Sequence, residues 1–231
     1  ENSLKRLSTD YIDLYQIHWP NHSTDVEGSM TQLQNLIKKG KVRSIGVCNF
    51  GVKDLNEILK FGELTTNQLP YNLLWRAIEQ EILPECKRND IGIICYSPLA
   101  QGLLTGRYKN ADEVPDGISR SRLFNHKRPL AKHNDVGCEK ELFSCIEKIN
   151  NIAQELGESS ALLSLSWVRY QPSVTSLLVG ARNPAELNLN LSAFDYEIDN
   201  KLKNQLSKMT EKIKEYLGKN PDMWNSNNRM R

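Results

Sequence analysis

Five short apolar runs alternate along this chain with segments of helical spacing, and this alternation restricts the fold more than any other feature. The runs are rich in β-branched and aromatic residues and occupy 11–17, 41–47, 65–69, 91–96 and 174–179. In the segments between them, apolar residues recur every three or four positions, as on the buried face of a helix. Strands that alternate with helices form βαβ units, whose strands run parallel in one sheet. The sequence therefore predicts an α/β protein with a parallel sheet.

The expected helices are separated by glycine, proline and polar residues. They occupy 29–39, 52–61, 77–88, 141–156, 184–193 and 197–217, and one more helix begins after a cap at Ser159 or Ser160. The helix at 77–88 is expected to break at Pro84. Residues 99–136 are rich in glycine, proline and charge and lack periodicity, and a loop of that length is usually functional. The tail 218–231, with Trp224 in a polar setting, is also expected to be a loop.

Five strands leave two architectures open. A parallel barrel needs eight strands in about 250 residues, whereas an open doubly wound sheet can be complete with five. The chain opens at Glu1 without an initiator methionine, on a segment (3–7) that is typical of the last turn of a helix. We therefore expect it to begin partway through a domain, which favours the later part of a barrel. The phosphate-binding patterns G-x-G-x-x-G and G-x-x-x-x-G-K-[ST] are absent.

Composition excludes several classes of function. The chain has 231 residues, 39% hydrophobic and 25% charged, with a formal net charge of +2. That charge gives no reason to expect nucleic acid or an anionic membrane as a partner. No apolar run approaches the ~20 residues of a membrane span, and no signal peptide is present, so the cytoplasm is the expected location. The five scattered cysteines indicate neither a disulfide framework nor a metal site.

The residues that follow the predicted strands carry the chemistry. The first strand is expected to be buried on both faces and to end at Pro20, which places His18 at its carboxyl end. Asn49, Gln68 and Tyr96 lie at the ends of the next three strands. Each residue alone has a structural explanation, as a helix cap, a partner of loop backbone or part of the core. Together they line the edge at which parallel α/β folds bind ligands.

These residue types suit a nicotinamide dinucleotide. An amide such as Asn49 or Gln68 both donates and accepts, so it can bind a carboxamide, and a tyrosine face such as Tyr96 can stack on a flat ring. Ser97 and the nearby glycines 102 and 106 allow backbone to approach a diphosphate closely. Arg182, just before a predicted helix, offers a guanidinium beside free backbone donors, which together favour an anion.

Four stretches resemble motifs of the aldo/keto reductase superfamily. They are LKRLSTDYIDLYQIHWP at 4–20, GKVRSIGVCNF at 40–50, YSPLAQGLLTGRY at 96–108 and VGARNP at 179–184, in family order and spacing. The resemblance implies a (β/α)8 barrel of which this chain supplies strands four to eight with their helices. Residues 1–231 would then form one incomplete barrel domain that lacks its N-terminal third and ends in a helix at about 197–217 and a tail at 218–231.

The resemblance also implies a role for individual residues. His18 resembles the active-site histidine that polarises the substrate carbonyl, and Tyr96 resembles the aromatic residue that stacks on nicotinamide. Cys48, where a serine is usual, would hold the carboxamide with Asn49 and Gln68. The diphosphate would be held by Ser97, Leu99, Gly102 and Arg107. The adenosine end would be held by Gly180, Arg182 and Asn190.

Departures from the family pattern affect the expected function. Glu186 and Leu189 replace residues that usually contact adenosine, so NADP is the expected cofactor only by a small preference and NAD stays open. The family's catalytic Asp, Tyr and Lys lie on strands that this chain does not contain. We expect an oxidoreductase that interconverts small carbonyl or sugar-like substrates with their alcohols, and we expect this chain alone to be inactive and to fold poorly or associate. The alternative is a cofactor-binding but catalytically silent regulatory subunit, or an inactive fragment.

Overall fold

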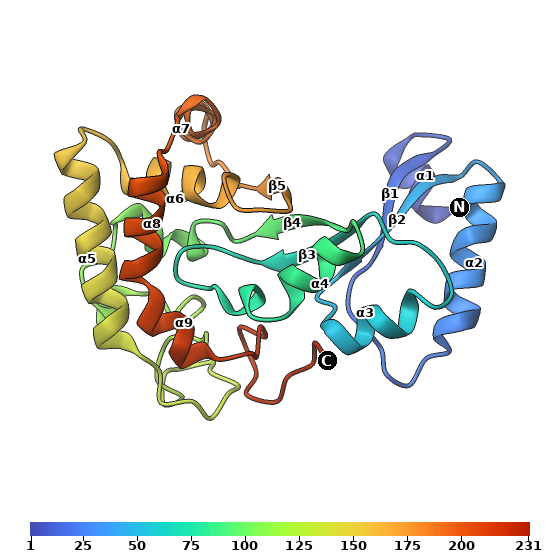
Figure 1. Ribbon diagram of the computed structural model, residues 1–231, viewed down its shortest axis with the longest axis horizontal. Coiled ribbons are helices and arrows are strands. Elements are labelled where there is room, and N and C mark those ends of the chain that lie inside the picture. Colours follow the sequence, from blue (N-terminus) through green and yellow to red (C-terminus); the bar gives the residue numbers. More distant parts are fainter.

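A five-stranded parallel sheet forms the centre of the protein (Figure 1). The computed structural model describes all residues from 1 to 231. Each strand pairs with the next one along the chain, so the order is β1-β2-β3-β4-β5 and the sheet is open, with β1 and β5 at its edges. The predicted α/β class with a parallel sheet is confirmed. The strands are β1 (Ile12–Ile17), β2 (Val42–Cys48), β3 (Thr66–Pro70), β4 (Gly92–Tyr96) and β5 (Val174–Leu178).

Helices lie around the sheet and gather at its two ends. Figure 1 shows α2 and α3 beside β1 and β2 at one end, and α5, α8 and α9 at the opposite end. The α-helices are α1 (Asn2–Leu7), α2 (Val26–Lys38), α3 (Val52–Ile58), α4 (Ile82–Arg88), α5 (Glu139–Glu155), α6 (Ser160–Arg169), α7 (Pro184–Asp195), α8 (Asn200–Met209) and α9 (Glu211–Leu217). Short 3-10 turns occupy Ala77–Glu79, Ala100–Thr105 and Ala111–Glu113.

Polar side chains cap the first turns of three of these helices, and among these caps the sequence predicted Ser159. Ser159 accepts a hydrogen bond from the backbone of the first turn of α6, Asn183 does so for α7, and Asp199 for α8. Such caps satisfy amide groups that have no partner within the helix. Gly40, just after α2, has a φ of 68°, a left-handed conformation that favours glycine.

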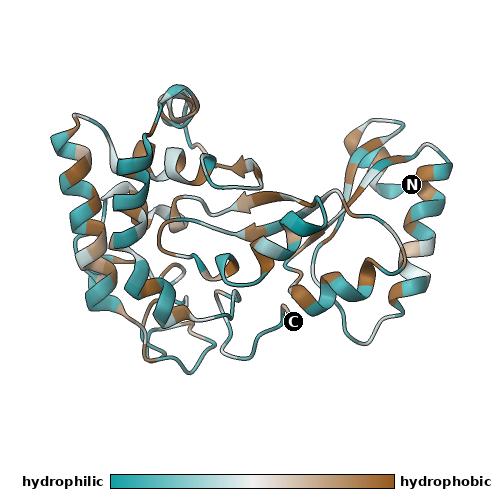
Figure 2. Ribbon diagram, viewed as in Figure 1, coloured by the Kyte–Doolittle hydropathy of each residue, from teal (hydrophilic) through white to brown (hydrophobic).

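Large aromatic residues form the centre of the hydrophobic core. Trp75 and Trp167 are fully buried, and the ring of Tyr71 lies 5.5 Å from that of Trp167. The indole of Trp75 donates to the carbonyl of Pro221 and that of Trp167 to the hydroxyl of Ser207, so neither buried N–H lacks a partner. In Figure 2, hydrophobic colour follows the strands, while α2 and α5 carry alternating hydrophobic and hydrophilic bands. The long helices are thus amphipathic, as their spacing predicts.

The prediction that the first strand is buried on both faces is wrong. No residue of β1 is fully buried, and Tyr15 is 37% exposed. The physical reason is that β1 is an edge strand, hydrogen-bonded only to β2, so its cover is incomplete. The apolar run identified a strand correctly but did not fix its place in the sheet.

The expected helix at 197–217 is interrupted at Thr210, which separates α8 from α9. The Arg76 guanidinium donates to the carbonyl of Ser207 at 2.6 Å and to the Thr210 hydroxyl at 3.2 Å. The Ser207 carbonyl also accepts from the backbone N–H of Thr210 at 3.3 Å, a tightened last turn that ends α8. The apolar spacing passes through this break and could not show it.

The tail after α9 has no helix or strand, yet it packs closely against the protein. Met223, Met230 and Asp222 are buried, and Trp224 is half-buried, not set among polar groups alone. Arg122 donates to the carbonyls of Asn220 and Asp222. The end of the tail lies next to α3 (Figure 1).

None of the helices combines the length and the apolar content that crossing a membrane requires.

Candidate active site

Four strand ends are joined by hydrogen bonds that meet at Asn49. The Tyr96 hydroxyl, at the end of β4, donates to Oδ1 of Asn49 at 2.9 Å. Nδ2 of Asn49 donates in turn to the backbone carbonyl of His18 at 3.2 Å, after β1. The backbone N–H of Asn49 also donates to the carbonyl of Gln68 in β3. The carboxyl ends of β1 to β4 therefore form one connected rim.

Asn49 is held in place by these bonds and by its backbone. It is buried, and its φ of 63° lies in the left-handed region, which asparagine tolerates better than most residues. With both ends of its amide engaged, Asn49 keeps one N–H and one lone pair for a ligand. Its predicted role as a carboxamide ligand stays a prediction, and its visible role is to connect the strand ends.

Gln68 and Cys48 lie side by side on β3 and β2, as partners in the register. The Gln68 side chain is half-buried and makes no hydrogen bond within the protein, so its whole amide is available to a ligand. Burial raises the pKa of the Cys48 thiol to about 11, so the thiol stays protonated at neutral pH and is a weak hydrogen-bond donor. Gln68 is therefore the stronger candidate for binding a carboxamide.

His18 is exposed just beyond β1, and its ring makes no hydrogen bond within the protein. The adjacent Trp19 is half-buried, with the guanidinium of Arg229 4.2 Å from the centre of its ring. An imidazole with free nitrogens at the rim can donate to a carbonyl oxygen of a bound molecule.

The remaining predicted cofactor residues line one cleft of about 800 Å³. Its two walls are the segment 97–107 that follows β4 and the segment 178–190 that includes the end of β5 and the start of α7. All seven residues assigned to the diphosphate and the adenosine end lie in these walls: Ser97, Leu99, Gly102, Arg107, Gly180, Arg182 and Asn190. The structure thus brings together in space two groups that are about 80 residues apart in the chain.

The first wall has an unusual backbone. Ser97, Ala100 and Gln101 have φ values of 52°, 48° and 57°, and Gly102 has a φ of 95°. The amide of Asn72 donates to the carbonyl of Ser97 at 2.9 Å and so anchors the start of this segment. Backbone in such conformations is strained for residues other than glycine, and clusters of such residues are typical of ligand-binding sites.

The second wall carries a charged pair. Nε of Arg182 lies 2.9 Å from Oε1 of Glu186, and the backbone N–H of Arg182 donates to Oε2 at 2.8 Å. The hydrogen bond from Arg182 holds the pKa of Glu186 below its usual value, and the same bond raises the pKa of Arg182. Asn190 donates to the carbonyl of Gly180 at 3.2 Å. The Glu186 carboxylate therefore offsets much of the attraction that Arg182 exerts on an anion.

The nicotinamide residues and the cleft residues form two adjacent groups. His18, Cys48, Asn49, Gln68 and Tyr96 lie at the strand ends and do not line the cleft. The two groups meet at the peptide bond between residues 96 and 97. A dinucleotide that spanned both would therefore be extended, with its ring at the strand ends.

Sequence reasoning missed a charged pair from the tail. Arg229 donates to the buried carboxylate of Asp222 at 2.6 Å. The pKa of Tyr96 is raised mainly by burial. The negative charge of Asp222 raises this pKa further, and the positive charge of Arg229 lowers it. The tail therefore places charge close to the rim. A lone acid and a lone arginine in a polar tail gave no sequence signal for this.

All five cysteines are buried and unpaired. No three side chains of His, Cys, Asp or Glu gather where they could hold a metal ion. The side chains of this chain therefore offer no ready ligand set for a metal.

Comparison with known proteins places these features in a family. Residues 1–211 match the model of the aldo/keto reductase family. Aldo-keto reductase YhdN of Bacillus subtilis is 38% identical over 188 residues, which cover 81% of this chain and 54% of that protein. The NADH-specific methylglyoxal reductase of Escherichia coli is 32% identical over 91% of this chain and 63% of that protein.

A solved structure agrees with the sequence relatives. The glycerol dehydrogenase AKR11B4 of Gluconobacter oxydans superposes with a TM-score of 0.78 at 29% identity, over 91% of this chain and 62% of that one. The chain thus spans between about half and two thirds of the length of the proteins that it matches. With 38% identity to YhdN and a family match over 211 residues, the chain belongs to the aldo/keto reductase family.

Proposed function

We propose that the protein to which this chain belongs is an NAD(P)(H)-dependent oxidoreductase that interconverts aldehydes or ketones with their alcohols. The observation that carries the proposal is that the strand-end rim and the 800 Å³ cleft are adjacent and meet between residues 96 and 97. The rim offers a free amide on Gln68 and an aromatic face on Tyr96, and the cleft offers Arg107 and Arg182. Amide, ring and cationic groups in that order match the chemistry of a nicotinamide dinucleotide.

The residues present fit such a cofactor. Gln68 would bind the carboxamide, the face of Tyr96 would support the nicotinamide ring, and Arg107 with the left-handed segment at 97–102 would hold the diphosphate. Gly180 has open space around its Cα at the far end of the cleft, where an adenosine can enter. When bound, the nicotinamide supplies or accepts the hydride. The protein's part is to orient that ring and to exclude side reactions.

The cofactor preference depends on Arg182 and Glu186. Arg182 favours the 2′-phosphate of NADP, but its pairing with Glu186 reduces this attraction, because the carboxylate repels the same phosphate. One relative is named for NADH specificity, which agrees with a weak or absent preference for NADP. We propose that the cleft accepts both dinucleotides, with NADP favoured by a small margin.

The proposed role of His18 is to donate a hydrogen bond to the substrate carbonyl and to stabilise the charge that develops on its oxygen. The proton donor must come from elsewhere, because the Tyr96 hydroxyl is already bonded to Asn49 and burial raises its pKa. We propose that the five strands correspond to the fourth to eighth strands of the family barrel. The catalytic Asp, Tyr and Lys would then come from strands outside residues 1–231, and these residues alone would bind cofactor without ordinary turnover.

The proposed substrates are small carbonyl or sugar-like compounds. Relatives are named for methylglyoxal and for L-glyceraldehyde 3-phosphate, both of which are small and polar. Arg229, whose side chain is 47% exposed near the rim, would be available to contact polar groups of such a substrate. A catalytically silent cofactor-binding protein is the second candidate, and the observation that favours it is the engaged hydroxyl of Tyr96.

Joining residues 1–231 to the amino-terminal strands of the Bacillus subtilis relative provides the test. With methylglyoxal and NADPH, the joined protein should show steady oxidation of the cofactor. His18→Ala should lower kcat by ~10²-fold or more while leaving the Kd of NADPH unchanged, because the lost contact belongs to the transition state. Turnover that His18→Ala leaves intact would refute the proposed role. A joined protein that binds NADPH but never oxidises it would favour the silent alternative.

A further inference from the structure

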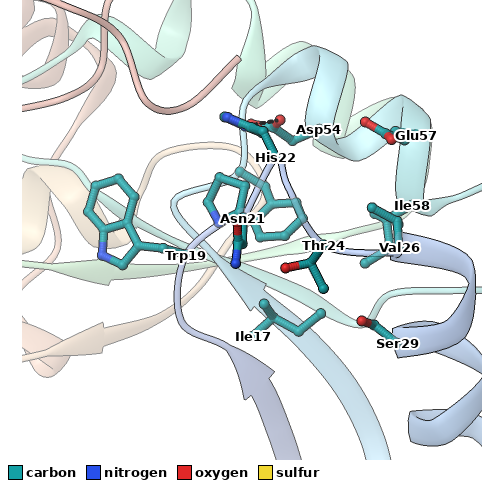
Figure 3. A pocket seen from close by; sticks show the side chains of 12 residues that line it. Ile17, Trp19, Asn21, His22, Thr24, Val26, Ser29, Asp54, Glu57 and Ile58 are labelled. Carbon is teal, nitrogen blue, oxygen red and sulfur yellow. Dashed lines mark hydrogen bonds and ion pairs between the residues drawn. The ribbon is translucent and has the colours of Figure 1, made fainter.

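A second cavity, of about 270 Å³, lies between the end of β1 and the helices α2 and α3. It shares no residue with the cleft of the candidate active site, and His18 is not part of its lining. Its walls come from the loop 19–24, the first turns of α2 and one side of α3 (Figure 3). None of the proposed steps of carbonyl reduction uses this cavity.

One wall of the cavity is apolar. Phe50 and Ile58 are buried, and Ile17 and Val26 are half-buried at its floor and side. Figure 3 shows Ile17, Val26 and Ile58 around the same space. An aliphatic or aromatic group that entered would lose contact with water and gain contact with these side chains.

The opposite wall is polar and contains a buried carboxylate that already has partners. Nε2 of His22 donates to Oδ1 of Asp54 at 2.9 Å, and the Asp54 side chain is only 2% exposed. Oδ2 of Asp54 accepts from the backbone N–H groups of Arg231, at 2.7 Å, and of Gly51, at 3.3 Å. The Arg231 guanidinium lies 3.6 Å from Oδ1. The charge of Asp54 is therefore balanced within the protein.

Glu57, one turn further along α3, differs from Asp54. Its carboxylate also borders the cavity, but it makes no hydrogen bond or ion pair within the protein (Figure 3). No lysine or arginine lines the cavity. Glu57 is therefore the carboxylate of the cavity that has no partner, whereas Asp54 is paired with His22 and Arg231.

The other polar groups also act mainly as acceptors. The Ser29 hydroxyl donates to the carbonyl of Asp25 at 2.7 Å, so it offers its lone pairs to the cavity. Nε2 of His22 is bonded to Asp54, so Nδ1 is the ring nitrogen that stays available to the cavity. Asn21 uses its Oδ1 for Ser23 and keeps an N–H to donate. A ligand that donates hydrogen bonds and carries positive charge suits this set best.

We propose that this cavity is a binding site for a small organic cation, a primary amine attached to one ring or to a branched chain. An apolar cavity of about 150 Å³ holds benzene, so the larger volume here fits a ligand of about ten non-hydrogen atoms. The apolar body of the ligand packs against Phe50 and Ile58, and its ammonium group lies next to Glu57. The site does not depend on the proposed reductase function.

The position of Trp19 connects the cavity with the rim. Trp19 lines the cavity, directly follows His18 in the chain and carries the Arg229 guanidinium over its ring. Asp54 in the cavity wall also holds the end of the tail through Arg231. The cavity therefore borders the two places at which the loop after β1 and the tail are fixed.

Calorimetric titration of the chain with 2-phenylethylamine tests the proposal, with phenylacetate as a probe of similar size and opposite charge. The amine should bind with a dissociation constant of about 1 mM or tighter, as expected for a ligand of this size, and phenylacetate at least about tenfold more weakly. Glu57→Gln should weaken binding of the amine by up to about fivefold, the range for an exposed ion pair. Glu63→Gln, an exposed residue beyond α3, provides the matched control and should have no effect.

A second variant fills the cavity. Ser29→Leu places a larger side chain into it from the surface of α2 and should abolish binding, while circular dichroism shows the unfolding midpoint of the parent. Equal affinity for the two probes, or equal affinity of the Glu57→Gln and Glu63→Gln variants for the amine, would overturn the proposal. Displacement of the amine by NADH would also overturn it, because the amine would then occupy the cofactor cleft.

Discussion

Arg122 anchors the tail, and its replacement should destabilise the protein substantially. The guanidinium is buried and donates to Asp135 at 2.6 Å and to the carbonyls of Asn220 and Asp222. Breaking a buried ion pair by removing one partner typically costs about 3–5 kcal/mol. The lower end applies here, because the Asp135 side chain is 18% exposed and keeps a hydrogen bond from Ser226. We expect Arg122→Met to lower the free energy of unfolding by about 3 kcal/mol.

The loss of stability caused by Arg122→Met should become smaller at acidic pH. Burial raises the pKa of Asp135, but hydrogen bonds from Ser226 and Arg122 lower it by more, so the net shift is downward. A carboxyl group whose pKa is lower in the folded state adds stability above its unfolded pKa of about 3.9 and loses it as the pH falls through the folded pKa. The difference in the free energy of unfolding between the parent and Arg122→Met should therefore be largest at neutral pH and should shrink below about pH 4.

Urea unfolding, followed by circular dichroism, measures both effects. Asp135→Asn and the double variant complete a thermodynamic cycle, in which the double variant should cost clearly less than the sum of the single ones. A loss below about 1 kcal/mol for Arg122→Met, or strict additivity in the cycle, would refute the idea that this buried pair holds the tail.

Three further predictions concern the cleft and the rim. Glu186→Gln should raise the affinity for NADPH relative to NADH, because it removes the carboxylate that offsets the charge of Arg182. If the ratio of the dissociation constants for NADPH and NADH equals that of the parent, the prediction is wrong. Gly102→Ala should destabilise the protein by about 1–2 kcal/mol in urea unfolding, since a φ of 95° strains any residue with a Cβ; an unchanged midpoint would contradict it. The alkylation rate of Cys48, followed by mass spectrometry, should rise with pH toward about 11, whereas a plateau near pH 9 would argue against a buried thiol.

Local signals in the sequence determined most of the elements. Gly40 and Ser159 mark helix ends and Pro184 marks the first turn of α7, because a left-handed turn, a capping oxygen and a fixed φ act on residues close by in the chain. The apolar runs gave the five strands for the same reason. The sequence could not show that β1 lies at the edge of the sheet, because the burial of β1 depends on its neighbours in space.

The candidate site could be predicted only in part. Motif resemblance identified the residues that line the cleft, although the segments around Gly102 and Arg182 meet only in the fold. The contacts of the tail were not foreseen, because Arg122 and Asp222 are 100 residues apart and no spacing rule joins them. The engagement of Asn49 by Tyr96 was likewise invisible, since it depends on the register of three strands.

Binding of the dinucleotide to residues 1–231, joined to the amino-terminal strands of the Bacillus subtilis relative, tests the central claim most directly. Titration with NADPH and with NADH, followed by the fluorescence of the reduced nicotinamide, should show saturable binding of both. Gln68→Ala should weaken binding by roughly 1–3 kcal/mol, the loss expected for one well-placed hydrogen-bonding group, and Gln32→Ala on the exposed face of α2 should leave it unchanged. Absence of binding, or equal affinity of the two variants, would contradict the assignment of the strand-end rim and the cleft as the cofactor site.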